Sequence, residues 1–150
     1  MFVCHSQSGK GEARLQVPKL NLGGFNAPTL TFLLYRYQNA AGKLSVKVTA
    51  DDKAYTEVYS ANTASFLPGW TVCKVNLAQY KDYPWIAIVF DGAVSNGSDY
   101  VIIDNMAVAN ESEFDAKLES IKGVRRPVVG ESENYTVVVK NNGKQSITYD

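Results

Sequence analysis

Acidic side chains are the first candidates for chemistry in this chain. Asp104 lies inside the apolar run 99–109, where a carboxylate can bind a structural cation or accept hydrogen bonds from backbone N–H groups. A glycosidase needs two carboxyl groups flanking one bond, and the sequence offers Asp91 with Asp104 as such a pair. The single histidine, His5, is a poor general base, because a base must be held in fixed geometry and His5 sits in a polar terminal stretch. The sequence predicts no enzyme, and the carboxylate-dependent hydrolase is kept only as the weakest alternative.

Aromatic side chains favour binding over catalysis. The chain has 9 tyrosines and 2 tryptophans. Rings at a surface can stack on sugars, and Tyr and Trp are enriched at protein interfaces. The predicted ligand-binding residues are Tyr35, Tyr37, Tyr55, Tyr83 and Trp85. The alternative is that these rings only cover the core, a packing role that we also expect of Trp70, at the start of a strand.

Composition excludes several classes of protein. Basic and acidic residues balance at 15 each and the pI is near 6.6, so the basic surface of a nucleic-acid-binding protein is missing. No apolar run is long enough for membrane insertion. The first residues lack the pattern of a signal peptide, which leaves a cytosolic chain or a piece of a longer secreted protein. The abundance of Tyr, Thr, Ser, Asn and Gly favours the second, and predicts an extracellular or cell-surface location.

The cysteines leave two interpretations open. Cys4 and Cys73 could form a disulfide closing a long loop, or could remain two free thiols. Nothing in the sequence fixes the distance between them.

Period-two alternation predicts a chain made of strands. In 29–37, Leu30, Phe32 and Leu34 share one face, and in 54–60, Tyr55, Glu57 and Tyr59 are expected to share one. Strands are predicted over 12–17, 29–37, 44–49, 54–60, 70–77, 85–90 and 99–109. Short strands at regular spacing, with turns between them and no long helix, indicate an all-β antiparallel jelly-roll sandwich.

The last of these strands contains a slip in its alternation. Val101 and Ile103 are in phase, but Met106 and Val108 follow one residue out of phase. A β-bulge at Asp104-Asn105 would keep both apolar pairs on one buried face.

The composition changes after residue 110. We predict a first domain over 1–110, a linker over 111–115 and a second domain over 116–150. In the second domain Tyr135, Val137 and Val139 alternate, the turn 141–143 follows, and a return strand begins at Lys144. So few strands indicate only part of an Ig-like domain.

Several segments in this order resemble the cleaved-adhesin domains, also called choice-of-anchor J or MAM-like jelly rolls. The resemblance covers 12–109 and is carried by Val17–Leu22, Pro28–Phe32, Leu44–Asp51, Trp70–Leu77, Trp85–Phe90 and Val101–Val108. Residues 115–150 resemble the opening half of a CARDB-type Ig-like domain, through Gly130-Glu131 and the segment Tyr135–Gly143.

This resemblance implies a non-catalytic adhesion or binding module of a larger secreted or surface-attached bacterial protein, with a glycan or a host or surface protein as its ligand. It also implies structural calcium, with Asp104 as the metal ligand. Some relatives carry Asp-x-Asp in the last strand, and Ile102 stands here at the first of these positions, which removes half of the carboxylate pair. The alternative is a purely structural spacer accompanying a secreted peptidase or glycosidase.

Overall fold

The computed structural model describes residues 1–111, 116–123, 130, 132, 134–141, 143, 145 and 146. The chain divides into two compact units, Met1–Asn110 and Glu111–Asp150. Of the predicted linker 111–115, all but Glu111 lies outside the described residues. The described helices are the short 3₁₀ turns Thr63–Ser65 and Ala78–Tyr80, and none is long and apolar enough to cross a membrane.

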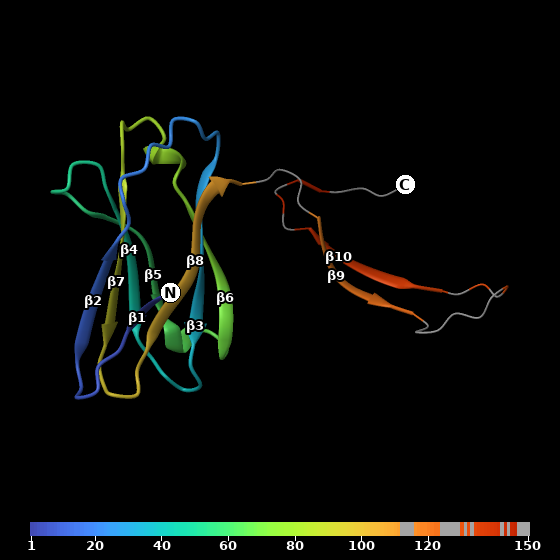
Figure 1. Ribbon diagram of the computed structural model, residues 1–150, viewed down its shortest axis with the longest axis horizontal. Helices are drawn as coiled ribbons and strands as arrows, with labels where there is room; N and C mark the ends of the chain where they lie inside the picture. Colours follow the sequence, from blue (N-terminus) through green and yellow to red (C-terminus); the bar gives the residue numbers. More distant parts are fainter. Residues whose placement is uncertain are drawn as a thin grey trace. The chain divides into compact units, whose positions relative to one another are not determined.

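Unit 1 is built from two four-stranded antiparallel sheets (Figure 1). The first has the order β1 (Phe2–Cys4), β8 (Val101–Asn110), β3 (Pro28–Arg36), β6 (Gly69–Asn76). The second has the order β2 (Gly11–Gln16), β7 (Ala87–Val94), β4 (Lys43–Thr49), β5 (Thr56–Asn62). Eight strands divided between two sheets in this order form a jelly roll, which confirms the predicted fold class.

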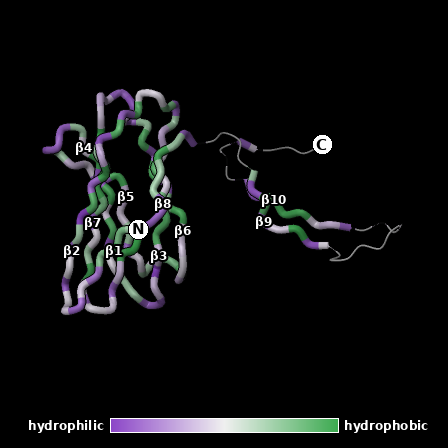
Figure 2. Tube along the Cα trace, in the orientation of Figure 1, coloured by the Kyte–Doolittle hydropathy of each residue, from purple (hydrophilic) through white to green (hydrophobic). Residues whose placement is uncertain are grey.

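The core of unit 1 lies between these sheets and follows from the alternation. Apolar side chains of β3 and β7 meet in its centre, where the Phe32 and Phe90 rings are 5.4 Å apart and nearly perpendicular. Both rings are fully buried. Hydrophobic residues recur along the strands of this unit, and several of its turns are hydrophilic (Figure 2).

The predicted β-bulge is present in β8. Thr31 of β3 is opposite Ala107, whereas Leu33, two residues on, is opposite Asp104, three residues back. The extra residue is accommodated at Asn105, whose φ of 50° lies in the left-handed region. Val101 and Ile103 are buried, and Met106 and Val108 pack against the same core, so the bulge keeps both pairs on one face.

A second register shift corrects the prediction for β5. Val46 is opposite Tyr59, and the next residue of β4, Lys47, is opposite Glu57. Tyr59 therefore turns inward and packs edge-on against Phe32, with ring centroids 5.6 Å apart. The expectation that Tyr55, Glu57 and Tyr59 share one face is wrong, because the bulge reverses the side to which Tyr59 points.

The two cysteines lie at opposite edges of the first sheet, Cys4 on β1 and Cys73 on β6. Both thiols are buried and free. Burial raises the pKa of each thiol, because it disfavours the charged thiolate.

In unit 2 the described strands are β9 (Ala116–Lys122) and β10 (Thr136–Asn141), which pair antiparallel. A register shift at Val138/Val139 places Val137 opposite Ile121 and Val139 opposite Leu118. These four side chains are about half exposed. The predicted return strand from Lys144 lies mostly outside the described residues, and the Ig-like assignment stays a prediction.

Candidate ligand-binding face

The outward side of the second sheet carries a hollow of about 540 Å³. The central strands β7 and β4 contribute the small residues Ala93 and Ser45 to its lining. Longer side chains, among them Glu12 and Glu57, rise from the edge strands β2 and β5. The charged and hydroxyl residues that line the hollow are Glu12, Arg14, Lys43, Ser45, Lys47, Glu57 and Asp91. We call this surface the Arg14–Asp91 face.

An ion-paired triad forms the middle of this face. Arg14 and Asp91 are directly opposite in the β2–β7 register, and Arg14 donates from Nε to Oδ1 at 2.6 Å and from Nη2 to Oδ2 at 3.0 Å. Lys47 of β4 donates to Asp91 Oδ2 at 2.9 Å from the other side. Hydrogen bonding from Arg14, supported by Lys47, holds the pKa of Asp91 below its ordinary value.

A second polar pair lies next to this triad. The Ser45 hydroxyl donates to Glu57 Oε2, joining β4 to β5. Three cations (Arg14, Lys43, Lys47) and three anions (Glu12, Glu57, Asp91) line the hollow, so its formal net charge is zero. The face therefore presents many hydrogen-bond donors and acceptors without attracting either sign of charge strongly.

Tyr55 lies against Arg14 and adds an aromatic ring to this face. The Arg14 Cζ atom is 5.6 Å from the ring centroid, and Tyr55 is 38% exposed. The preceding turn is held by Asp51, whose Oδ1 accepts the N–H groups of Lys53 and Ala54 at 2.9 and 2.8 Å. The bond from Ala54, followed by that from Lys53, lowers the pKa of Asp51. An ordered turn thus places one predicted ligand-binding residue beside Arg14.

Trp85 is already covered on one face by a cation. The Lys19 ammonium lies 3.6 Å from the centroid of the Trp85 ring and 2.7 Å from Asp52 Oδ2. The ring is half-buried. A ligand that stacked on this face of Trp85 would have to displace Lys19.

The other predicted aromatics lie elsewhere in unit 1. Tyr35 packs beside Trp70 with centroids 4.8 Å apart, Tyr37 meets Tyr100 at 5.5 Å, and Tyr83 lies 6.1 Å from Tyr80. Tyr35 is on β3 in the first sheet, whereas Tyr55 contacts Arg14 of the second, so the five predicted residues do not form one surface.

Trp70 does not close the core as expected. It is 50% exposed and stands opposite Tyr35 on the outward side of the first sheet, because the strand register turns its side chain away from the sheet facing it. Register also aligns Val3 with Ile102, and Ile102 with Tyr35. Val3, Ile102, Tyr35 and Trp70 thus form a line across all four strands, which we call the apolar row.

Asp104 has partners of its own. Its Oδ1 accepts the Asn105 N–H at 2.9 Å and lies 3.2 Å from the terminal amine of Met1; these interactions, the first being the larger, lower its pKa. Among the described residues, no three His, Cys, Asp or Glu side chains are grouped to hold a cation. Calcium takes six to eight oxygen ligands, of which the Asp104 carboxylate supplies at most two, and the calcium site stays a prediction of the resemblance.

The structure does not bring Asp91 and Asp104 together. Asp91 points outward from β7 in the second sheet, and Asp104 stands opposite the outward Leu33 in the first. The core separates the two carboxyl groups, so they cannot flank one glycosidic bond.

The sequence analysis missed one candidate binding residue, Arg14, and one structural carboxylate, Asp99. Arg14 lies in a plain alternating stretch, and only the pairing of β2 with β7 reveals its partner. Asp99 is 5% exposed and accepts the N–H groups of Ala41, Ser95 and Asn96. The run Ser95–Ser98, rich in turn-forming residues, was the available signal for such a buried loop carboxylate.

Comparison with known proteins adds no assignment: no protein-family model matches the chain, and no curated protein matches it either. The resemblance to cleaved-adhesin and CARDB-type domains therefore stays a prediction, while the jelly-roll topology stands on the strand order itself.

Proposed function

We propose that unit 1 is a non-catalytic binding module of a larger secreted or cell-surface protein, and that its Arg14–Asp91 face binds a neutral saccharide. The observation that carries this proposal is the charge-balanced hollow, in which ion pairs fix donors and acceptors beside the Tyr55 ring.

The chemistry of a sugar ring suits this combination. Its hydroxyl groups both donate and accept hydrogen bonds, so they can bind a carboxylate oxygen and a neighbouring guanidinium or ammonium. Its C–H faces are apolar and can lie against an aromatic ring such as Tyr55. Because Arg14 and Lys47 are already fixed by Asp91, little side-chain freedom remains to be lost when a ligand binds.

An oligosaccharide array tests this proposal. We expect the intact chain to retain neutral oligosaccharides in preference to acidic ones. Tyr55→Ala and Arg14→Met should each weaken binding by about tenfold or more, the equivalent of 1.4 kcal/mol. Lys74→Met, an exposed change outside the hollow, serves as the matched control.

Two outcomes would overturn the saccharide proposal. An array without any bound neutral sugar would favour the spacer role, and binding that ignores both Tyr55→Ala and Arg14→Met would place the ligand elsewhere. Circular dichroism of each variant separates loss of a contact from loss of the fold.

A protein ligand is the second candidate, favoured by the apolar row. Trp70 and Val3 are 50% and 43% exposed, and the neighbouring Val72 is 59% exposed. Contiguous apolar side chains centred on a Tyr–Trp pair are typical of the central part of a protein interface. Pull-down from surface-protein extracts with the wild type and Trp70→Ala tests this; a partner held equally well by both would argue against the row.

A further inference from the structure

A polar pocket of about 250 Å³ lies among the turns at one end of unit 1. One wall is the segment between β3 and β4, the other is the segment between β7 and β8, and Figure 1 shows both segments at the same end of the sandwich. Residues 37–40 line the first wall, and Asn96, Ser98 and Asp99 line the second. None of these residues lines the Arg14–Asp91 face, and we call this separate feature the loop-end pocket.

The buried carboxylate of Asp99 joins the two walls. Its Oδ1 atom accepts the Ala41 N–H at 3.0 Å, and its Oδ2 atom accepts the N–H groups of Ser95 and Asn96 at 3.1 and 3.2 Å. The Tyr100 N–H donates to the Ala41 carbonyl at 3.1 Å, which adds a further link. The walls are therefore fixed before a ligand arrives, and this lowers the entropy lost on binding.

The polar groups that the pocket offers to a ligand are uncharged. They are the side-chain amides of Gln38, Asn39 and Asn96 and the hydroxyl of Ser98, and all four residues are exposed. The Asn96 Oδ1 atom accepts the Ser98 N–H at 2.9 Å, which leaves the NH₂ group of that amide to donate. Amides and hydroxyls present donors and acceptors side by side, as the hydroxyl groups of a sugar require.

Tyr37 adds an aromatic ring that is 45% exposed. The ring meets Tyr100 at a centroid distance of 5.5 Å, and Tyr100 in turn stacks on His5 at 4.2 Å. The next residue, Gln38, has a φ of 44°, in the left-handed region that disfavours residues other than glycine. Residues held in such conformations cluster at ligand-binding sites.

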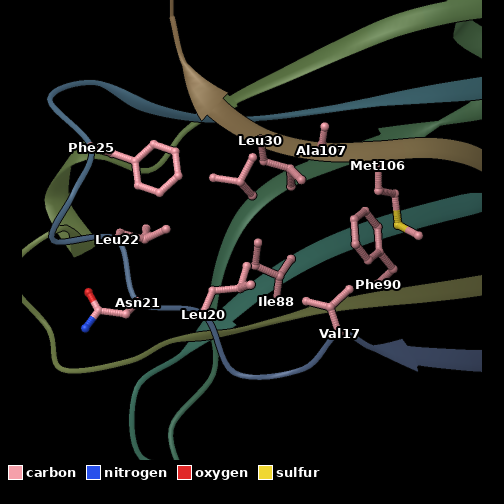
Figure 3. A pocket seen from close by; sticks show the side chains of 11 residues that line it. Val17, Leu20, Asn21, Leu22, Phe25, Leu30, Ile88, Phe90, Met106 and Ala107 are labelled. Carbon is pink, nitrogen blue, oxygen red and sulfur yellow. The ribbon is translucent and has the colours of Figure 1, made fainter.

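A comparison of two cavities in unit 1 indicates the class of ligand. An apolar cavity of about 270 Å³ is lined, apart from Asn21, by apolar side chains of both sheets, among them Ile88 and Met106 (Figure 3). The loop-end pocket combines one ring with neutral polar groups, and its only aliphatic side chain is that of Ala40. Pockets for drug-sized molecules begin at about 300 Å³, so the loop-end pocket suits a smaller ligand.

We propose that the loop-end pocket is a second binding site, which takes a single neutral sugar residue. The C–H face of the sugar lies against Tyr37, and its hydroxyl groups exchange hydrogen bonds with Gln38 and Asn96. Asp99 is a positioning residue that holds the two walls together and does not touch the sugar. Because this site shares no lining residue with the Arg14–Asp91 face, unit 1 can hold two sugar residues at once, which raises its avidity for a surface that displays many glycans.

Amide chemical-shift mapping with methyl glycosides of neutral monosaccharides tests this proposal. We expect saturable shifts over 37–41 and 95–99, and these shifts should remain in the double variant Arg14→Met/Tyr55→Ala. Tyr37→Ala should raise the sugar concentration needed for half-saturation by about tenfold or more. Gln79→Ala, an exposed change outside the pocket, is the control and should leave that concentration unchanged.

Gln38→Gly separates loss of a contact from loss of the fold. Glycine adopts a φ of 44° without strain, so this variant should melt at or near the wild-type temperature and still bind the sugar several-fold more weakly. Glucuronic acid and glucosamine, which carry opposite charges, should bind more weakly than neutral sugars.

Three results would overturn the loop-end site: no saturable shift over 37–41 and 95–99 with any neutral monosaccharide, half-saturation that neither Tyr37→Ala nor Gln38→Gly changes, or tighter binding of a charged sugar. Each amide signal reports its own surroundings, so the mapping distinguishes failure of this site from failure of the Arg14–Asp91 face.

Discussion

Arg14 and Asp91 face each other across the β2–β7 ladder, and the guanidinium contacts both carboxylate oxygens at 2.6 and 3.0 Å. This geometry is bidentate, which makes it more directional than a single contact between charges. Lys47 approaches the same carboxylate from β4. A single acid therefore ties together three strands on the surface where we place the ligand.

The triad predicts an acid-sensitive contribution to stability. Because the folded pKa of Asp91 is lowered, its contribution is complete above the unfolded-state pKa near 3.9 and is lost as the pH falls through the lower folded value. Asp91→Asn should therefore be less stable than wild type at pH 7. The difference in the free energy of unfolding between the two proteins should shrink towards pH 2. Urea unfolding across this range measures it. Asp82→Asn, on an exposed turn, is the control. If the stability difference between wild type and Asp91→Asn did not change with pH, the Asp91 carboxylate would not be its source.

Tyr59 predicts the opposite response at alkaline pH. Burial, followed by its 3.3 Å contact with Cys73 Sγ, raises the pKa of its hydroxyl. The raised pKa contributes stability below the unfolded-state value near 10, and this contribution is lost as the pH rises from there towards the folded value.

Tyr59→Phe should lower the free energy of unfolding by about 1 kcal/mol at pH 7, since it removes one hydrogen bond. Above pH 10 the stability of this variant should fall less steeply with pH than that of the wild type. Chemical unfolding followed from pH 7 to 11 is the measurement. Tyr83→Phe, at a site that is 48% exposed, is the control. If it reduced the loss of stability at alkaline pH as much as Tyr59→Phe does, that loss could not be assigned to the buried Tyr59 hydroxyl.

The bulge at Asn105 predicts an unusual preference for glycine within a strand. A left-handed backbone costs most residues about 1–2 kcal/mol, and β-branched residues fare worst. Asn105→Gly should stay close to wild type, whereas Asn105→Val should lose about 1–2 kcal/mol in thermal or urea unfolding. Ala109→Val, exposed in the same strand, is the control for added bulk. Equal stability of the Gly and Val variants would mean that φ is not positive at this position.

Substitution of the loop residue Asp99 is expected to destabilise the fold strongly. Its carboxylate accepts three backbone N–H groups, from Ala41, Ser95 and Asn96, at 3.0 to 3.2 Å. Asp99→Ala leaves buried donors without a partner and should cost about 2–3 kcal/mol, while Asp99→Asn, which keeps one acceptor, should cost less. Differential scanning calorimetry compares the three proteins. A loss below 0.5 kcal/mol for Asp99→Ala, the usual range for surface changes, would refute this structural role.

The sequence predicted those parts of unit 1 that depend on local alternation. Leu30, Phe32 and Leu34 point inward because a strand has period two, and the slip at Asp104-Asn105 was visible because apolar pairs stood on both sides of it. The bulge in β5 was missed, because the residues around Val58 are mostly polar and show no apolar alternation whose phase could be compared on its two sides. β1 was also missed, because a three-residue strand is too short to show a period.

The candidate site depends on relationships that alternation does not encode. Tyr55 was predicted as a surface ring, but its position beside Arg14 depends on two segments far apart in sequence. Trp70 was assigned to packing because a large ring at the start of a strand can close one end of the core, yet strand register turns it outward beside Tyr35. Such features follow from which strands become neighbours, and that order is set by the whole sandwich.

Amide chemical-shift mapping with the neutral oligosaccharide selected by the array tests the central claim most directly. Saturable shifts should gather on β2, β7, β4 and the turn before Tyr55, and in Arg14→Met and Tyr55→Ala they should need about tenfold or more sugar to saturate. Shifts confined to the apolar row, or no saturable shift with any neutral sugar, would contradict the assignment of this face as the saccharide site.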